Sequence, residues 1–367
     1  MSLTIVLGTR PEIIKCAPVV HEALRRGVPC VIIHTGQHYT PELDEVFFRE
    51  LDLPAPITNL NVGSLPPAKQ VAAMMDRLYD AFLEWKPSVV VVQGDTNSVL
   101  AGALTAHKMG VPVAHLEAGL RSDDWGMPEE GNRVLAGNVA DIHFCPTEVQ
   151  RIRLATEGVL DGVHVVGNTV VDAARHYVGK AEGTSKVLET LNLEPGSFAL
   201  LTMHRPSNVD EPGRLGALID AIEDMAVSYG WKIVFPVHPR TETALKTAGL
   251  WDRLEASPVF VLSKPVGYLD LLHLQASASL VVTDSGGMQE EANILQVPCI
   301  TLRANTERPE TVKAGGNVLY EGTESAELIA LAKEMTSKPR DWTCPFGDGR
   351  TAERVMDVLM TFLDTKV

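Results

Sequence analysis

The stretch Ser279-Leu-Val-Val-Thr-Asp-Ser-Gly-Gly-Met-Gln-Glu-Glu291 decides the fold of this chain. Residues 280–283 are apolar or β-branched and predict a buried strand, which runs into a tight turn at 285–287. A helix is predicted to begin near Met288, and Glu291 lies in its first turn. A buried strand that enters a helix through glycines is typical of a parallel α/β sheet.

The turn of this stretch, Ser285, Gly286 and Gly287, is a candidate phosphate site. The adjacent glycines allow positive φ angles and a close approach of the backbone to a ligand. The helix that follows directs free N–H groups and a partial positive charge at the same space. The Glu291 carboxylate is placed to reach a ribose hydroxyl. The alternative is a plain turn whose glycines serve packing, since the stretch is neither a Walker loop nor a GxGxxG fingerprint.

Length and composition exclude several classes of protein. A chain of 367 residues suggests two domains, and 45% hydrophobic with 22% charged residues is ordinary for a soluble enzyme. The net charge of −15 disfavours nucleic acid or an anionic membrane as a main partner. The five cysteines are odd in number and form no CxxC pair, which predicts reduced thiols and a cytoplasmic location. We expect no signal peptide and no membrane span.

Strand and helix patterns alternate along the whole sequence, which indicates parallel sheets covered on both faces. We expect an α/β chain with two Rossmann-like, doubly wound parallel-sheet domains that face a cleft. The first domain is expected at 1–171, with a C-terminal helix at about 352–367, and the second at 172–351. The strands are predicted at 3–7, 28–35, 88–93, 111–115, 142–145, 164–166, 198–202, 232–237, 259–262, 280–283, 299–302 and 318–320.

Polar clusters follow the predicted strands, at the edge where ligands bind in doubly wound sheets. Three carboxylates in the first half, Asp95, Glu117 and Glu129, lie in such clusters. Together they would resist each other's ionisation, so we expect at least one to hold a proton near neutrality. Paired acid and base catalysis requires this property. Taken alone, Asp95 would be interpreted as a helix cap.

Basic groups occur at the same edges. Arg10 and Lys15 follow the first strand and would suit a diphosphate, although Lys15 alone is better explained as a solvated charge. In the second half, His204 could protonate a leaving phosphate or donate a hydrogen bond to it. His238 is as readily a loop histidine as a ligand, and Arg308 belongs to another charged loop. No spacing resembles a zinc or calcium motif, so we expect no metal and no cofactor.

Taken in order, these clusters resemble the non-hydrolysing UDP-N-acetylglucosamine 2-epimerases. The matching stretches are collinear over nearly the whole chain, and their combination is specific although each alone is weak. They are GTRPEIIK at 8–15, TGQH at 35–38, QGDTNS at 93–98, HLEAGLRS at 115–122, PEEGNR at 128–133, CPTE at 145–148, VGNTVVDA at 166–173, MHRPSNVD at 203–210, PVHPR at 236–240, TDSGGMQEE at 283–291 and TERPE at 306–310.

The resemblance implies the glycosyltransferase-B-like architecture, with UDP held mainly by the second domain, and usually a homodimer. It implies inversion of carbon 2, which interconverts UDP-GlcNAc and UDP-ManNAc for polysaccharide or cell-wall glycan synthesis. The reaction resembles an elimination of UDP to a 2-acetamidoglucal, followed by readdition. Which carboxylate performs which step stays open. The family motif carries over to Asp95, Glu117, Glu129, Arg133, His204 and Glu291.

Two departures from the family pattern concern regulation and substrate. Many bacterial members have Gln-His-Arg-Glu after the second strand, a region tied to allosteric activation by UDP-GlcNAc, whereas residues 37–42 of this chain are QHYTPE. The loop before Pro128 is also shorter than in those members. We therefore expect no such activation. Both departures leave room for another acetamido sugar, such as a diacetamido uronic acid.

Three other functions compete with this interpretation. A hydrolysing epimerase would release UDP and free ManNAc, but such relatives usually depart from the GTRPE found here at 8–12. A retaining glycosyltransferase would use the same UDP site but would leave three carboxylates unexplained. A catalytically silent nucleotide-sugar sensor is disfavoured because those carboxylates and His204 are intact. Fold alone cannot separate these functions, because function depends on the site.

Overall fold

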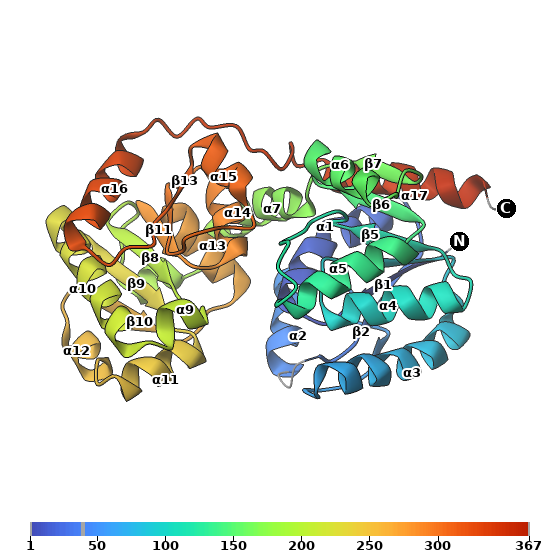
Figure 1. The fold of residues 1–367 in the computed structure, drawn as a ribbon, viewed down its shortest axis with the longest axis horizontal. Helices are drawn as coiled ribbons and strands as arrows, with labels where there is room; N and C mark the ends of the chain where they lie inside the picture. Colours follow the sequence, from blue (N-terminus) through green and yellow to red (C-terminus); the bar gives the residue numbers. More distant parts are fainter. Residues whose placement is uncertain (1, 38–40, 366–367) are drawn as a thin grey trace. The chain divides into compact units, whose positions relative to one another are not determined.

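The computed structural model describes residues 2–37 and 41–365, and the chain divides into two compact units (Figure 1). Unit 1 comprises Met1–Ala173 and Phe346–Val367, and unit 2 comprises Ala174–Pro345. The expectation about Tyr39 and Thr40 lies outside the described residues. Among the helices of the described ranges, none has the length and apolar character needed to cross a membrane.

Unit 1 is built on a seven-stranded parallel sheet in the order β3-β2-β1-β4-β5-β6-β7. Its strands are β1 (Leu3–Leu7), β2 (Cys30–His34), β3 (Thr58–Asn59), β4 (Val89–Gln93), β5 (Val113–Leu116), β6 (Ile142–Cys145) and β7 (Val163–Val165). Its helices are α1 (Arg10–Arg25), α2 (Pro41–Glu50), α3 (Pro67–Trp85), α4 (Asn97–Lys108), α5 (Pro128–Val139), α6 (Glu148–Thr156) and α17 (Thr351–Thr365), while α7 (Thr169–Thr184) crosses the unit boundary.

Unit 2 is built on a six-stranded parallel sheet in the order β10-β9-β8-β11-β12-β13. Its strands are β8 (Phe198–Thr202), β9 (Lys232–Pro236), β10 (Phe260–Ser263), β11 (Leu280–Thr283), β12 (Cys299–Thr301) and β13 (Asn317–Leu319). Its helices are α8 (Val187–Thr190), α9 (Pro206–Val209), α10 (Pro212–Tyr229), α11 (Pro239–Thr247), α12 (Trp251–Ala256), α13 (Tyr268–Ser277), α14 (Gly286–Ile294), α15 (Pro309–Ala314) and α16 (Ser325–Ser337).

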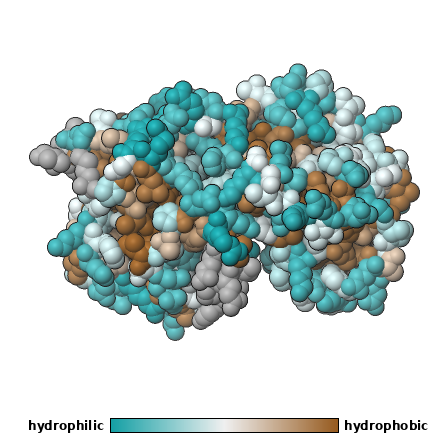
Figure 2. All heavy atoms as spheres, turned by 180° about the vertical axis from the view of Figure 1, so that it is seen from behind, coloured by the Kyte–Doolittle hydropathy of each residue, from teal (hydrophilic) through white to brown (hydrophobic). Residues whose placement is uncertain are grey.

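The apolar strand sequences explain why both sheets are central. All residues of β1, β4 and β11 are buried, as expected for parallel strands that helices cover on both faces. The helix α17 packs on α1, where Arg26 pairs with Asp357 at 2.6 Å. The face drawn in Figure 2 is largely hydrophilic with scattered apolar patches, so most of the large apolar side chains lie in the cores.

The six strands of unit 2 have the same order as the first six strands of unit 1, and this order fixes where ligands bind. Strand order reverses between β1 and β4 in unit 1 and between β8 and β11 in unit 2. In sheets of this kind, ligands bind beyond the carboxyl ends of the strands at such a switch point. The segments that matter for function are therefore the turns after these four strands and after the neighbouring β5.

The predicted fold class, two doubly wound parallel sheets, is confirmed. Four predicted strands agree with β1, β6, β8 and β11 in both bounds, whereas the two-residue β3 was not predicted. One detail of the opening stretch is wrong. The helix α14 begins at Gly286, not near Met288, and neither Gly286 nor Gly287 has a positive φ. These glycines take ordinary helical angles in the first turn, because the turn itself is made by Asp284 and Ser285.

Candidate active site

Glu117 is the most constrained carboxylate of unit 1. It follows β5 directly, has a φ of 62° and is 9% exposed. A non-glycine residue in this region is strained, and such strain persists where surrounding contacts hold it, often at functional sites. Lys15 Nζ donates to Oε1 at 2.6 Å, Asn168 Nδ2 donates to Oε1 at 2.7 Å, and Gln93 Nε2 donates to Oε2. These three donors fix the orientation of the carboxylate.

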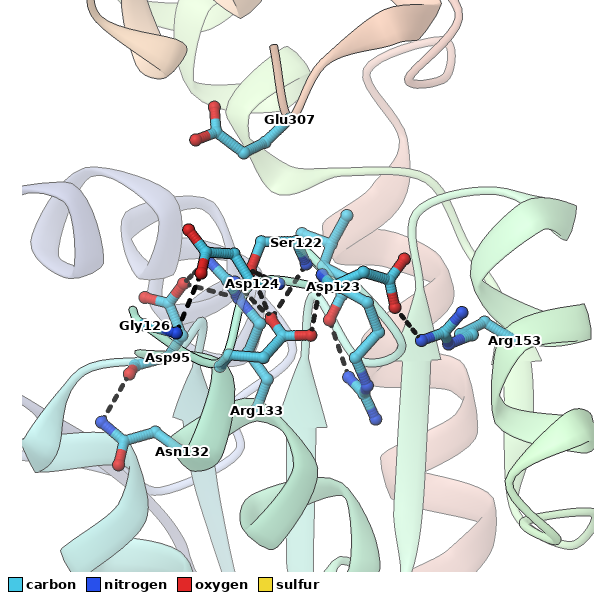
Figure 3. A network of polar contacts seen from close by, with 12 residues as sticks. Asp95, Ser122, Asp123, Asp124, Gly126, Asn132, Arg133, Arg153 and Glu307 are labelled. Atoms are coloured by element: carbon cyan, nitrogen blue, oxygen red, sulfur yellow. Dashed lines mark hydrogen bonds and ion pairs between the residues drawn. The ribbon is translucent and has the colours of Figure 1, made fainter. Parts of the chain in front are cut away.

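Asp95 is held by one cation and is more accessible (Figure 3). It follows β4, and Arg133 donates to its Oδ2 from Nε at 2.9 Å and from Nη2 at 2.5 Å. The side chain of Asp95 is 30% exposed, and Oδ1 has no partner within the residues that the structure describes. Asn132 Nδ2 donates to the Asp95 carbonyl at 2.9 Å and fixes the backbone. Asp95 therefore presents one oriented carboxylate oxygen to incoming molecules.

The two glutamates at the start of α5 have different environments. Glu130 is buried and accepts from Ser122 N at 2.9 Å, Ser122 Oγ at 2.8 Å and Arg133 Nη1 at 2.8 Å. Burial raises the pKa of Glu130, but these hydrogen bonds outweigh it and lower the pKa to about 2. Glu129 is half-buried, and its side chain has no hydrogen bond or ion pair to other described residues. Glu130 thus orients Arg133, and Glu129 remains the candidate for contact with a substrate.

Two of these three carboxylates have a cation beside them, which the expectation of mutual repulsion did not include. Asp95 and Glu117 each face their own cation, Arg133 and Lys15. The carboxyl group near this edge with a strongly raised pKa is Glu12, which the sequence analysis did not select. Burial raises the pKa of Glu12 to about 7 against hydrogen bonds from Thr96, Gly8 and Thr9. Its donors are all neutral, so they offset burial only in part.

Glu12 also joins two turns of the switch point. It accepts from Gly8 N and Thr9 N, both at 2.8 Å, and from Thr96 Oγ1 at 2.5 Å. Thr96 is the residue after Asp95, so Glu12 ties the β1–α1 turn to the segment that carries Asp95. The Thr9 and Glu12 pair is a capping box at the start of α1. The spacing Thr-Arg-Pro-Glu at 9–12 is the signal that could have identified it.

The two basic residues predicted in unit 1 have different surroundings. The guanidinium of Arg10 lies over the Phe47 ring, 5.4 Å from its centroid, in a cation–π contact. Lys15 is buried and bonded to Glu117, so it is not the solvated charge of the alternative interpretation. Arg121 pairs with Glu157 at 2.6 Å.

His204 of unit 2 is bonded to a buried carboxylate. It follows β8, and its Nδ1 lies 3.0 Å from Oδ1 of Asp284, which follows the neighbouring strand β11 and is fully buried. Asp284 also accepts from His204 N at 2.9 Å and Arg205 N at 2.8 Å. Burial raises the pKa of Asp284, but the hydrogen bonds from His204 and Arg205 lower it overall. Asp284 was not among the predicted site residues, although it follows a buried strand as Asp95 does.

His238 lies beside His204, with ring centroids 5.5 Å apart. It is the N-cap of α11, because its Nδ1 accepts from Arg240 N at 3.2 Å. The capping role shows that His238 has a local structural function, and its ring still borders the ring of His204.

The predicted phosphate site is the N-terminus of α14. Ser285 is the N-cap in an extended conformation, and its side chain makes no capping bond to the described residues. A Cβ built at Gly286 would meet only Oε2 of Glu307, at 4.0 Å, and one at Gly287 would meet nothing within 4 Å among the described residues. Glu307 is paired with Arg303 at 2.7 Å. The turn is therefore open, as a site for an anion requires.

Glu291 and Arg308 each contact a buried partner. Glu291 is buried beside Tyr268, whose pKa is raised by burial and then by the Glu291 carboxylate. Arg308 Nε lies 2.6 Å from Oε1 of the buried Glu290. Glu290 and Glu291 are consecutive in α14, so both partners anchor the helix behind the phosphate site.

These groups form two sets, each within one unit. In unit 1, the structure brings together Asp95 with Arg133 and Glu117 with Lys15. In unit 2, it brings together His204 with His238, both beyond the end of the sheet that carries α14. Oriented carboxylates are suited to removing and returning a proton, and an imidazole beside a helix N-terminus is suited to a phosphate. Among the described residues, no cluster of three or more His, Cys, Asp or Glu side chains could hold a metal ion.

Comparison with known proteins identifies the family. The family model described as UDP-N-acetylglucosamine 2-epimerase matches residues 22–360. A UDP-N-acetylglucosamine 2-epimerase of Methanocaldococcus jannaschii is 46% identical over 362 residues, covering 98% of this chain and 99% of that protein. A UDP-2,3-diacetamido-2,3-dideoxy-D-glucuronate 2-epimerase of Pseudomonas aeruginosa is 37% identical over 365 residues, covering 98% and 99%.

Solved structures agree with these relatives. The crystal structure of the M. jannaschii UDP-GlcNAc 2-epimerase in complex with UDP-GlcNAc and UDP is similar with a TM-score of 0.88 at 46% identity, covering 98% of this chain and 100% of that chain. A wall teichoic acid polymerase has a TM-score of 0.60 at 11% identity, covering 100% and 89%, and at that identity shows the fold alone. The family model and the full-length identities together show that the chain belongs to the UDP-N-acetylglucosamine 2-epimerase family.

Proposed function

We propose that this protein interconverts UDP-N-acetylglucosamine and UDP-N-acetylmannosamine by inverting carbon 2, without net hydrolysis. The observation that carries the proposal is the division of chemistry between the two switch points. Unit 1 presents carboxylates that cations orient, and unit 2 presents an imidazole and an open helix N-terminus. Inversion beside a diphosphate leaving group needs both kinds of group.

The carboxylates of unit 1 would carry the proton of carbon 2. One carboxylate removes this proton while the bond between carbon 1 and the diphosphate oxygen breaks, and the bonding pair leaves with UDP. The resulting 2-acetamidoglucal has a double bond between carbons 1 and 2. UDP then adds back to carbon 1, and carbon 2 receives a proton on its other face. Asp95 is suited to one of these transfers, because Oδ1 is accessible while Arg133 fixes Oδ2.

The groups of unit 2 would hold UDP. The free N–H groups of α14 and Ser285 would receive the diphosphate, and His204 would meet the charge that develops on the departing oxygen. Glu291 would accept from the ribose hydroxyls. Arg308 is held by Glu290 and would add positive charge near the same helix. Arg10 and Lys15 of unit 1 would also act on the sugar-diphosphate. Lys15 would act indirectly, through its bond to Glu117.

A homodimer in the cytoplasm is part of this proposal. Support for the dimer is the family resemblance, and support for a reducing compartment is that all five cysteines are free. Sedimentation equilibrium would test the dimer, since a mass near 39.8 kDa would indicate a monomer.

A related acetamido sugar is the second candidate substrate. The observation that favours it is the 37% identity to a relative named for UDP-2,3-diacetamido-2,3-dideoxy-D-glucuronate. The higher identity of 46% favours UDP-N-acetylglucosamine. A hydrolysing epimerase, which would release UDP and free ManNAc, is the third candidate. Proton NMR of the products distinguishes it from the other two.

Proton NMR of UDP-GlcNAc incubated with the protein in deuterium oxide tests the proposal. We expect deuterium at carbon 2 and the appearance of UDP-ManNAc. Free ManNAc with UDP would indicate hydrolysis instead. No change with UDP-GlcNAc, but exchange with the diacetamido uronic acid, would move the substrate to the second candidate. No exchange with either sugar would overturn the proposed function.

A further inference from the structure

Asp284 lies at the switch point of unit 2. It is the first residue after β11, and His204 is the second residue after the neighbouring β8. The last residues of these two strands, Thr202 and Thr283, are paired in register. The backbone therefore delivers the carboxylate and the imidazole to the same place, at the position where ligands bind in such sheets.

The Asp284 carboxylate is completely enclosed. It is 0% exposed, and all its partners donate to it. The backbone N–H groups of His204 and Arg205 donate to Oδ2 at 2.9 and 2.8 Å, and Asn208 Nδ2 donates to Oδ2 at 3.2 Å. His204 Nδ1 faces Oδ1 at 3.0 Å. Backbone donors and an imidazole keep this group ionised, and its pKa is lowered despite burial.

An ionised carboxylate has no hydrogen to give, so the hydrogen between Asp284 and His204 belongs to Nδ1 of His204. In the neutral ring, this leaves Nε2 without a hydrogen. Nε2 is then the nitrogen that gains and loses a proton, and the ring is 38% exposed, so it has access to a ligand. The imidazolium that forms on protonation is stabilised by the negative charge of Asp284.

We propose that Asp284 is a positioning residue that fixes the Nδ1–H tautomer of His204 and thereby directs Nε2 to the departing diphosphate. The proposal rests on the proposed function and deepens it. His204 acts from its imidazolium form, which carries a hydrogen on both nitrogens. When the bond to carbon 1 breaks, the Nε2 hydrogen is shared with or passes to the diphosphate oxygen that receives the bonding pair, and the ring is left as the neutral Nδ1–H tautomer. On readdition, the hydrogen returns to Nε2, so the proton count is restored over the full reaction.

A purely structural role for Asp284 is the alternative, because the same carboxylate holds the backbone at His204 and Arg205. Asn208 separates the two explanations. It donates to Asp284 and to the carbonyl of Leu302 at 2.9 Å, so it belongs to the same buried network without touching the imidazole. An Asn208→Ala variant weakens the network, whereas Asp284→Asn removes the charge that faces Nδ1.

The first test needs no variant of Asp284. Long-range proton–nitrogen spectra of protein labelled with nitrogen-15 in its eleven histidines report the tautomer of each ring, and the His204 signal is assigned with His204→Gln. We expect the Nδ1–H tautomer for neutral His204. An Nε2–H tautomer, or an equal mixture, would overturn the proposal. This result does not depend on whether the protein acts on UDP-GlcNAc, so it is distinct from the failure of the proposed function.

The second test compares kinetics of the two variants. For Asp284→Asn we expect kcat to fall by at least about 100-fold, the range for a lost proton transfer, with a mixed tautomer and a KM changed by less than about threefold. For Asn208→Ala we expect the native tautomer and a kcat within about threefold of the original. Equal losses of kcat in both variants would show that the network is only structural, and would overturn the proposal. If Asp284→Asn does not fold, the tautomer of the unchanged protein still decides.

Discussion

Unit 1 and unit 2 have the same strand order, yet the buried carboxyl groups at their switch points have opposite protonation behaviour. Glu12 of unit 1 is 1% exposed and Asp284 of unit 2 is 0% exposed. Burial acts to raise the pKa of both, but only Glu12 ends above its usual range, at about 7. Glu12 accepts only from neutral donors, whereas Asp284 also faces an imidazole. The partner, and not the depth of burial, decides which carboxyl group stays charged.

The same rule separates the proposed catalytic carboxylates from Glu12 within unit 1. Asp95 and Glu117 each have a cation, Arg133 and Lys15, although Thr96, the residue after Asp95, donates to Glu12. In unit 1, the carboxyl group with the raised pKa, Glu12, is therefore separate from the carboxylates that we propose to move a proton. In unit 2, the buried carboxylate of Asp284 contacts the imidazole that we propose to meet the diphosphate. Variants at these positions can test this difference between the two units.

Glu117→Gln should cause the largest loss of stability. The Lys15 side chain is 10% exposed, and its ammonium would lose the negative charge of Glu117 inside unit 1. Breaking a buried ion pair from one side costs about 3–5 kcal/mol. Urea unfolding should show this loss of free energy of unfolding. Glu129→Gln is the control and should change stability by less than about 0.5 kcal/mol, because Glu129 is half-buried. Equal stability of the two variants would show that Lys15 does not need the charge.

Asp95→Asn should leave the fold intact and remove activity. Losing a general acid or base lowers kcat by at least about 100-fold, while KM changes much less because proton transfer contributes little to substrate binding. Initial rates of UDP-ManNAc formation measure both constants. Asp123→Asn is a matched control, because Asp123 pairs with Arg153 at the surface (Figure 3). Full kcat in Asp95→Asn would exclude Asp95 from the proton transfer.

Much of the placement of the site residues could be predicted from the sequence, because the sequence shows which residues follow a buried strand. Buried strands such as β4 and β11 are continuous apolar runs, and the residues that follow them, Asp95 and Ser285, lie at the switch points as expected. The predicted bounds of β11 agree with the structure and those of β4 differ by one residue, because a run of four β-branched or apolar residues admits few alternatives. The two-residue β3 has no such run, so the sequence gives no signal for it.

The sequence did not show which side chains pair with each other, because the partners are close in space but distant in the sequence. Lys15 and Glu117 are 102 positions apart, and His204 and Asp284 are 80 apart, so no local pattern joins them. The expected repulsion between the carboxylates likewise left out the cations beside Asp95 and Glu117, which come from α5 and α1. Positive φ at Gly286 was also wrong, because the helix already begins there. By contrast, the sequence Thr-Arg-Pro-Glu at 9–12 indicates the capping box that contains Glu12.

Glu12→Gln should change how stability depends on pH. Glu12 has a folded pKa of about 7 against an ordinary 4.5, so its contribution is fully present below pH 4.5 and is lost as pH rises through 7. His115 and His143 have pKa values that burial lowers to about 4, so their contribution is lost as pH falls from 6.5 toward 4. The two effects oppose each other between pH 4.5 and 6.5.

Removing Glu12 should therefore make stability fall more steeply with acid. The slope should change by at most one proton, about 1.4 kcal/mol per pH unit. Urea midpoints measured from pH 4.5 to 7.5 give the slope, and Glu148→Gln, which alters an exposed pair with Arg151, is the control. Parallel curves for Glu12→Gln and the original protein would mean that Glu12 is ionised throughout, and the contrast with Asp284 would disappear.

Gly286→Ala should have the smallest effect on the protein and a selective effect on the ligand. The turn after β1 in unit 1 has no room for a side chain, since a Cβ at Gly8 would lie 2.0 Å from Thr35 Oγ1. A Cβ at Gly286 would have no neighbour closer than 4.0 Å among the described residues. Gly286 has a helical φ, so alanine should stabilise the helix by roughly 0.5 kcal/mol. The added methyl would instead occupy the space in front of the N–H groups of α14.

Calorimetric titration with UDP should then show a weaker Kd, by up to about tenfold, in a protein of equal or higher stability. Gly213→Ala is the matched control, because Gly213 also lies in the first turn of a helix, α10, and has no neighbour within 4 Å among the described residues. It should gain the same helix stability and keep the original Kd. Unchanged UDP affinity in Gly286→Ala would remove the α14 turn from the phosphate site. The empty space at the N-terminus of α14 would then have to be explained by something other than anion binding.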